Sequence, residues 1–236
     1  MPAQQYASHV EKVHAQVEGR APARSAIAAS WARSMFHHGL EPDLRRPQDL
    51  LSQSELRFEQ QRLDRLLHIA KPIMETLFAA VVKTGCCVML TNKESVVLHR
   101  LIHDVDERPL NVLGARSGAI WSEQRVGTNG VGTCALEERP VLIYKDQHYL
   151  EEIIGMSCAG APIFDASGDL IAVLDISSAR DDMNDSFAQM MASLVISAAN
   201  RIETEYFRAS FDGARIIVAD EVTALGTPLL ASDRDD

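Results

Sequence analysis

Two long stretches of the chain carry apolar residues at every third or fourth position. The first runs from Leu56 to Val82, and the second follows Asn184 and reaches Tyr206. This spacing predicts two amphipathic helices, and Asn184 is a residue type that caps helix N-termini. We expect the first helix to kink or split between His68 and Pro72, because proline removes a backbone donor and clashes with the preceding turn.

Between these helices the spacing changes to that of β-strands. We expect a charged loop over Asp104–Pro109 and a short helix over Gln147–Ile154. The order of elements predicts an α+β fold in which a largely antiparallel sheet carries its helices on one face. The predicted strands are Cys86–Thr91, Val96–Ile102, Val141–Lys145, Gly160–Phe164 and Leu170–Ser177.

The pattern of apolar and polar residues in the last predicted strand indicates which face of the sheet packs against the helices. From Leu170 to Ser177 the even-numbered positions are all apolar, whereas the odd-numbered ones include Asp175 and Ser177. Successive side chains of a strand point to opposite faces. We therefore expect the apolar side to face the helices and the mixed side, with Asp175, to face a ligand.

A small helical appendage is predicted before this domain. Ile27, Trp31 and Met35 recur at spacings of four, and Gly39 followed by Leu40 is typical of a helix end in which glycine is left-handed. We expect residues 1–50 to form the appendage and residues 51–211 the sheet domain. Residues 212–236 are expected to be an acidic tail or the start of a next module.

The segment from Trp121 to Cys134 is rich in glycine and short polar residues, which favour tight turns. It predicts a loop that caps a helix over Val131–Glu138. It is also a candidate lid over a pocket, with Trp121 as an aromatic wall and Thr133 or Cys134 facing inward. Its glycine spacing matches neither common phosphate-binding motif, so we expect no nucleotide-hydrolysing site.

The cysteines and histidines are candidates for catalysis or metal binding, and also for simple packing. Cys134, Cys158, His148 and Asp175 are placed to converge on one side of the sheet, as a thiol enzyme requires. Buried cysteine, however, more often packs as a small apolar residue, so we expect no catalytic residue. The eight histidines and four cysteines lack the spacing of a zinc site, and we expect neither metal nor cofactor.

Net charge and hydropathy argue against three classes of protein: nucleic-acid-binding, membrane-spanning and secreted proteins. The formal net charge of −10 disfavours direct contact with nucleic acid. The longest apolar run, Leu77–Val82, is too short for a membrane span, and the first twenty residues lack a secretory signal. We expect a cytoplasmic protein with free thiols.

Several motifs, in this order along the chain, resemble the N-terminal sensor region of acetoin-catabolism-type regulators. These are bacterial sigma-54-dependent transcription activators whose sensor contains a GAF domain. The resemblance covers roughly residues 25–211, and a set of linked motifs is more specific than a lone glycine pattern. The motifs are Ser30–Ser34, Gly39–Pro42, Trp121–Glu123, Gly127–Thr133, Arg139–Val141, Asp146–His148, Ala161–Asp165 and Leu174–Ser178.

The resemblance implies a GAF-like sensor that binds a small oxygenated metabolite, such as a ketone, alcohol or diol. It implies that the signal passes to ATPase and DNA-binding domains, for which this chain carries no motif, and we expect the C-terminal helix to carry it. The apolar stripes of the long helices favour a homodimer. Two alternatives stay open: a sensor of a protein partner, like dihydroxyacetone-kinase regulators, and a thiol-dependent reductase on a GAF scaffold. The ligand-binding residues expected by position are Trp121, Thr133, Cys134, His148, Cys158 and Asp175.

Overall fold

A five-stranded antiparallel sheet in the order β2-β1-β5-β4-β3 forms the centre of the protein. The computed structural model describes residues 3–18, 25–218 and 229–232. All five predicted strands are present, and β4 begins earlier than expected because Ser157 and Cys158 pair with β3. The strands are β1 (Cys86–Asn92), β2 (Val97–Leu101), β3 (Val141–Tyr144), β4 (Ser157–Phe164) and β5 (Leu170–Ser178).

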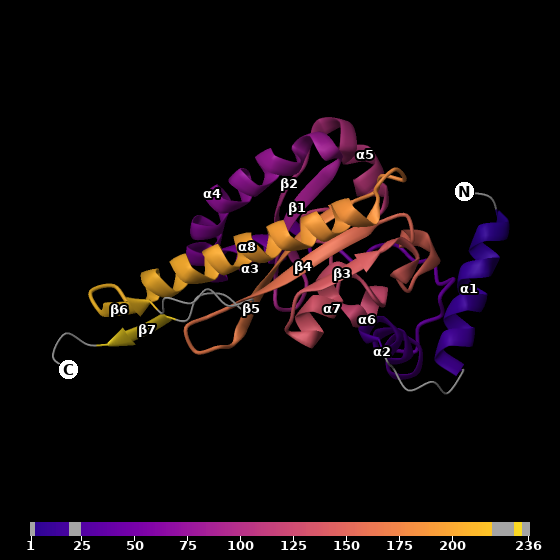
Figure 1. Ribbon diagram of the computed structural model, residues 1–236, viewed down its shortest axis with the longest axis horizontal. Helices are drawn as coiled ribbons and strands as arrows, with labels where there is room; N and C mark the ends of the chain where they lie inside the picture. Colours follow the sequence, from indigo (N-terminus) through magenta and orange to yellow (C-terminus); the bar gives the residue numbers. More distant parts are fainter. Residues whose placement is uncertain (1–2, 19–24, 219–228, 233–236) are drawn as a thin grey trace.

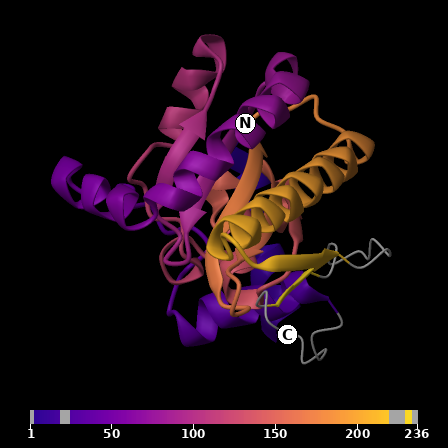
Figure 2. The ribbon, with the colours of Figure 1, turned by 90° about the vertical axis from the view of Figure 1, so that its left-hand side faces the viewer.

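Two long helices, α4 (Asp64–Val81) and α8 (Asp185–Ser210), lie side by side on one face of the sheet (Figures 1 and 2). Ala172, Leu174 and Ile176 of β5 are buried in the core between this face and the helices. The predicted assignment of the apolar side of β5 to the helices is therefore confirmed.

The N-terminus of α8 is capped as predicted, since the Asn184 side chain accepts a hydrogen bond of 2.8 Å from the backbone amide of Phe187. Asn184→Ala leaves this amide without its partner. We expect the free energy of unfolding to fall by about 1 kcal/mol, measured by urea denaturation. Ser193→Ala, an exposed change within the same helix, is the control and should change stability by less than about 0.5 kcal/mol. Equal losses in both variants would contradict a capping role.

The predicted break at Pro72 is wrong. The helical stretch divides at Leu63 instead, between α3 (Gln53–Arg62) and α4, and Pro72 lies inside α4. Pro72 and His68 are both exposed. Water can therefore bond the His68 carbonyl, which the proline leaves without a helical partner, so this position tolerates proline.

Two other predicted elements need correction. The expected loop Asp104–Pro109 is part of a helix, α5 (Asp104–Val112), whose first turn carries three acidic residues that favour a helix N-terminus. Only Leu110 of this helix is buried, so it has no apolar stripe to reveal it. The expected helix Gln147–Ile154 is replaced by two 3₁₀ turns, η3 (Lys145–Gln147) and η4 (Glu151–Ile153).

The second face of the sheet is covered by short elements and a second apolar core. This core contains Cys87 and Met89 of β1 together with Trp121 and Trp31. The elements on this side include α6 (Glu123–Val126), α7 (Gly130–Glu137) and the N-terminal helices α1 (Ala3–Glu18), α2 (Ala26–Ala32) and η1 (Arg33–His37), a π-helix. The face that we expected to be open for a ligand is thus packed with the chain's own side chains.

The helical segment of the N-terminal appendage ends at the predicted glycine. Gly39 has a left-handed φ of +63°, and the Leu40 amide donates back to the Ser34 carbonyl at 3.0 Å. Leu40 is buried in the second core, so the turn fixes the chain against the domain. The boundary between appendage and domain near residue 50 stays a prediction.

Beyond α8, the strands β6 (Arg215–Val218) and β7 (Leu229–Ser232) form an antiparallel pair. The expected tail or next module over residues 212–236 lies largely outside the described residues and stays a prediction. Within the described part of the chain, no helix combines the length and apolarity that crossing a bilayer demands.

Candidate ligand site

Asp175 lies in the middle of the second sheet face. It is fully buried on β5, between Met89 of β1 and Gly160 of β4. The Ser177 hydroxyl donates a hydrogen bond to Oδ1 of Asp175, whereas Oδ2 has no hydrogen-bond partner. Burial raises the pKa of this carboxyl from 3.8 to about 7. A buried polar atom without a partner is rare in folded proteins and calls for an explanation.

A polar chain leads from Asp175 to the turn after β3. The Ser177 hydroxyl lies 3.1 Å from the Cys158 sulfur, which in turn lies 3.3 Å from Nε2 of His148. Nδ1 of His148 lies 2.9 Å from the Lys145 carbonyl oxygen. These contacts join the predicted residues Asp175, Cys158 and His148 into one buried cluster.

The thiols of this cluster are unsuited to nucleophilic chemistry. Burial raises the pKa values of Cys134 and Cys158, and the nearby Asp175 carboxylate raises them further. Burial also lowers the pKa of His148 to about 4, so this imidazole is neutral at pH 7. A neutral thiol beside a neutral imidazole provides no thiolate, which leaves the thiol-reductase alternative without support from the geometry.

Helix α7 closes directly over Asp175. A Cβ atom at Gly130 would lie 2.6 Å from Oδ2 of Asp175 and 2.5 Å from Cβ of Cys158, and one at Gly160 would lie 2.3 Å from the Gly130 carbonyl oxygen. Both glycines are therefore needed for the first turn of α7 to reach the strands. Cys134 lies on the same helix, fully buried against this contact.

The glycine-rich segment folds as the predicted capping loop. Asn129 is the N-cap of α7, and its Oδ1 accepts hydrogen bonds from the amides of Val131 and Gly132. Its Nδ2 donates to the carbonyl of Trp121 at 2.9 Å. The backbone carbonyl of Trp121 is thus bonded to the N-cap residue of α7. Nε1 of the Trp121 indole donates to the Gly114 carbonyl at 3.2 Å.

The six predicted residues are all at most 3% exposed. Thr133 and Cys134 lie on α7, and Cys158 and Asp175 lie on the strands against which its first turn packs. His148 contacts Cys158, and the Trp121 side chain packs in the second core. Whether they bind a ligand stays a prediction, and any ligand there must displace existing packing.

Glu123, a carboxylate that is 3% exposed, is a buried polar centre that was not among the predicted site residues. Its oxygens accept hydrogen bonds from Nε of Arg33 at 2.6 Å, the Ser30 hydroxyl at 2.6 Å and the Thr133 hydroxyl at 2.8 Å. The Ser30 hydroxyl also lies 2.6 Å from that of Thr128. We call Ser30, Arg33, Glu123, Thr128 and Thr133 the Glu123 cluster.

This cluster joins the N-terminal appendage to the glycine-rich loop. Ser30 and Arg33 come from α2 and η1, whereas Glu123 begins α6 and Thr133 lies on α7. Hydrogen bonds to Glu123 raise the pKa of Arg33, which also contacts Glu137 at 2.8 Å. Three of the motifs that carry the family resemblance, Ser30–Ser34, Trp121–Glu123 and Gly127–Thr133, therefore meet in space. Their separation of about ninety residues left no spacing from which this contact could be predicted.

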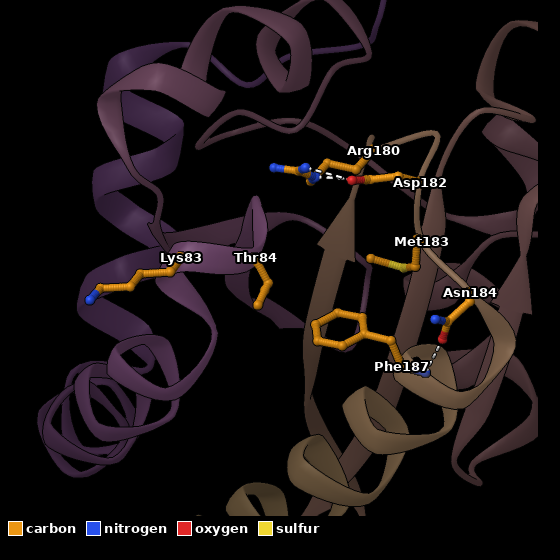
Figure 3. Close-up of a pocket in the computed structure, with 7 residues that line it drawn as sticks. All are labelled: Lys83, Thr84, Arg180, Asp182, Met183, Asn184 and Phe187. Atoms are coloured by element: carbon orange, nitrogen blue, oxygen red, sulfur yellow. Dashed lines mark hydrogen bonds and ion pairs between the residues drawn. The ribbon is translucent and has the colours of Figure 1, made fainter.

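A surface cavity of about 240 Å³ is lined by Lys83, Thr84 and five residues between Arg180 and Phe187 (Figure 3). Met183 and Phe187, which form its apolar side, belong to the core on the helix face. Arg180 is paired with Asp182 at 2.7 Å, and Figure 3 shows Lys83 extending away from the other lining residues. The cavity therefore offers no unpaired charge directed inward.

Another cavity, of about 290 Å³, lies between α3, α4 and β2 and is lined by polar side chains such as Gln60, Lys71 and His99. Neither of these two cavities contains a predicted ligand-binding residue. Across the described ranges, no three His, Cys, Asp or Glu side chains are grouped to hold a metal ion.

Comparison with known proteins identifies relatives among transcriptional regulators. The chain is 30% identical over 184 residues to the acetoin catabolism regulatory protein of Cupriavidus necator, covering 78% of this chain and 28% of that protein. It is 32% identical over 159 residues to the acetoin dehydrogenase operon transcriptional activator AcoR of Bacillus subtilis, covering 65% of this chain and 25% of that one. The chain thus spans about a quarter of the length of these relatives.

A third relative is the propane 2-monooxygenase operon transcriptional activator MimR of Mycolicibacterium goodii, which is 31% identical over 159 residues and covers 60% of this chain and 27% of that protein. Among solved structures, the E. coli DhaR(N)–DhaL complex matches with a TM-score of 0.69 at 16% identity, over 83% of this chain and 71% of that one. This likeness confirms the GAF-like α+β fold.

The family described as the MimR N-terminal domain matches residues 15–204. This range includes α2, the Glu123 cluster, the whole sheet and most of α8. The chain therefore belongs to the MimR N-terminal domain family and is related to the N-terminal sensor regions of sigma-54-type transcriptional activators.

Proposed function

We propose that this domain is a cytoplasmic sensor of a small oxygenated metabolite that bears a hydroxyl group, and that the metabolite binds at Asp175. The observation that carries the proposal is the fully buried Oδ2 of Asp175, which has no partner although the protein spends stability to bury it. A ligand hydroxyl that donates to Oδ2 completes the hydrogen bonding of this carboxylate.

The surroundings of Asp175 favour a compact and largely apolar ligand. Cys134, Cys158 and Met89 lie around the carboxylate and offer only weak hydrogen-bonding groups. Gly130 is in contact with Oδ2, so the first turn of α7 must move to admit even a small molecule. A pocket that is mostly apolar with one or two placed polar groups is typical of sites for small metabolites.

The protonation state of Asp175 decides which ligand group it prefers. Above its pKa of about 7 the ionised carboxylate accepts a hydrogen bond from an alcohol, and below that pH the neutral acid donates one to a ketone. A hydroxyl-bearing ligand should therefore bind more tightly at pH 8 than at pH 6, and a simple ketone should show the opposite trend.

Calorimetric titration of the purified chain with acetoin, glycerol and acetone tests the proposal. We expect heat from acetoin or glycerol at pH 8, and at least tenfold weaker binding in Asp175→Asn, because the amide nitrogen cannot accept the ligand hydroxyl. Asp169→Asn makes the same chemical change in an exposed turn and should bind as the parent does. Equal binding by the parent and by Asp175→Asn would contradict a site at Asp175.

A protein partner is the second candidate effector, and the close packing of the predicted site favours it. Large apolar side chains are exposed elsewhere, at Phe36, Val105, Val112 and Leu136. The solved complex of DhaR(N) with DhaL is an example of a protein-bound relative of this fold. Absence of heat from all three compounds at pH 6 and pH 8 would favour this candidate over a metabolite.

The output in either case is proposed to run through α8. This helix packs against both α4 and the sheet and leads toward the C-terminal end of the chain. We include in the proposal that the domain acts as a homodimer, since the apolar Met190 of α8 is 45% exposed and Leu194 is half-buried.

A further inference from the structure

We propose that the Glu123 cluster is a latch that holds the N-terminal helices on the domain, and that movement of α7 at the Asp175 site opens it. The proposal rests on the proposed function for the identity of the trigger. The latch itself is inferred from contacts within this chain and can be tested without a ligand.

The first turn of α7 touches both sites. Gly130 lies against Oδ2 of Asp175, and Thr133, three residues later, donates from its hydroxyl to Glu123 at 2.8 Å. Residues three apart in a helix lie on neighbouring parts of its surface, and a short helix moves as a unit. A group that enters beside Asp175 and displaces Gly130 must therefore also displace Thr133 from Glu123.

Glu123 in turn holds the appendage. Ser30 and Arg33 contact its carboxylate, with two nitrogens of Arg33 at 2.6 and 3.0 Å. Gly132 keeps α7 tight against this region, because a Cβ atom there would lie 2.3 Å from the Glu123 amide nitrogen. The carboxylate is thus held between α7 and the N-terminal helices, and a shift of α7 changes its position relative to Arg33.

A second anchor of the appendage also leads to the Asp175 site. Nε1 of Trp31 donates to the Gln147 carbonyl at 2.8 Å, and Nε2 of His9 lies 3.1 Å from the Tyr149 carbonyl oxygen. The residue between these two carbonyls is His148, which contacts Cys158. The N-terminal helices are therefore held at Glu123 and at residues 147–149. Glu123 is bonded to Thr133 of α7, and His148 contacts Cys158, so both places are in contact with residues of the Asp175 site.

Gly130→Ala tests, without any ligand, whether displacement of α7 opens the latch. Its methyl group enters the space beside Asp175 and Cys158, so α7 must move outward. We expect backbone amides of residues 29–38 to exchange hydrogen for deuterium about tenfold faster than in the parent, as for the loss of one hydrogen bond to a charged group, with the amides of β1 unchanged. Gly155→Ala is the matched control, because nothing lies within 4 Å of a Cβ atom there.

Thr133→Val tests the latch at the Glu123 cluster itself. It is the second variant, to be used if Gly130→Ala does not fold. It removes the hydroxyl from Glu123 with little change in volume, and we expect the same faster exchange over residues 29–38. Thr76→Val, an exposed change on α4, is its control. Unchanged exchange over residues 29–38 in Thr133→Val would overturn the latch.

The ligand experiment separates this proposal from the proposed function. If acetoin or glycerol binds and residues 29–38 exchange faster in the complex, both proposals are supported. Binding without any change in these amides would overturn the coupling and leave the sensor proposal intact. If no compound binds but Thr133→Val loosens residues 29–38, the latch is supported and the metabolite proposal fails.

Discussion

Asp175→Asn is expected to make the folded domain more stable at pH 8, by about 2–4 kcal/mol in the free energy of unfolding. Burial raises the pKa of the Asp175 carboxyl from 3.8 to about 7, which corresponds to about 4 kcal/mol of unfavourable free energy once the group is ionised. Asparagine keeps the acceptor for Ser177 and carries no charge. Its amide nitrogen takes the place of the unpaired Oδ2, so part of the burial cost is retained.

The sign of the pH dependence follows from proton binding. Unfolded chains release the proton of Asp175 near pH 4, whereas the folded domain keeps it until about pH 7. Between these values the folded state binds more protons than the unfolded state, so raising the pH lowers the free energy of unfolding. Above pH 7 both states are ionised and this contribution stays constant.

Urea denaturation of the parent and Asp175→Asn between pH 4 and pH 8 measures the difference. The two proteins should be of similar stability at pH 4 and diverge as the pH rises to 7. Asp169→Asn controls for the change in net charge and should follow the parent within about 0.5 kcal/mol. A parent that is more stable than Asp175→Asn at pH 8 would show that the carboxylate has a stabilising partner.

Together with the titrations, this experiment addresses why the chain retains Asp175. A residue that lowers stability at neutral pH is expected to be kept for function, since functional sites often reduce stability. A gain in stability with a loss of ligand binding in the same variant is the combination that a sensor site predicts. A gain in stability with no effect on any binding would leave the buried charge without this explanation.

The parts of the fold that follow from local patterns were predictable. Alternation along β5 separated the core side, with Leu174, from the side with Asp175, because side-chain direction in a strand depends only on position. Asn184 and Gly39 marked helix ends, since a cap and a left-handed turn each require a particular residue type. These features need no information from distant parts of the chain.

The predictions that were wrong concern features that depend on tertiary surroundings and not on local sequence patterns. Whether Pro72 breaks a helix depends on the exposure of the carbonyl it displaces, and α5 lacks a buried stripe apart from Leu110. In both cases tertiary surroundings decide the outcome, and these are not encoded in spacing. The same holds for the open face expected around Asp175, since only the packing of Gly130 against Cys158 reveals that α7 covers it.

The candidate site was predictable in part for the same reasons. The face of β5 identified Asp175, and Cys158 and His148 do lie beside it. Glu123, by contrast, sits in a polar stretch with no helical or strand periodicity, and its partners Ser30 and Arg33 are about ninety residues away. Polar contacts between residues so far apart in the sequence can be identified only from the folded structure, which brings the segments together.

Trp121→Ala is expected to cost about 3–5 kcal/mol of stability, as for other large aromatic residues removed from a core. The indole is 2% exposed and packs in the second core, and its Nε1 donates to the Gly114 carbonyl. The variant leaves a cavity and a carbonyl without its partner. Urea denaturation at pH 7 measures the loss, and a cost below about 1 kcal/mol would mean that the surrounding loops collapse into the space.

Trp121→Phe distinguishes a structural role from contact with the effector. It retains an aromatic ring in the core but removes the hydrogen bond to Gly114, so we expect a loss of about 1–2 kcal/mol. Because Nε1 of the indole is already bonded to the Gly114 carbonyl, we expect binding of acetoin or glycerol to the folded variant to be unchanged. Binding weakened more than tenfold in a fully folded Trp121→Phe would instead make Trp121 a wall of the ligand site, as the sequence predicts.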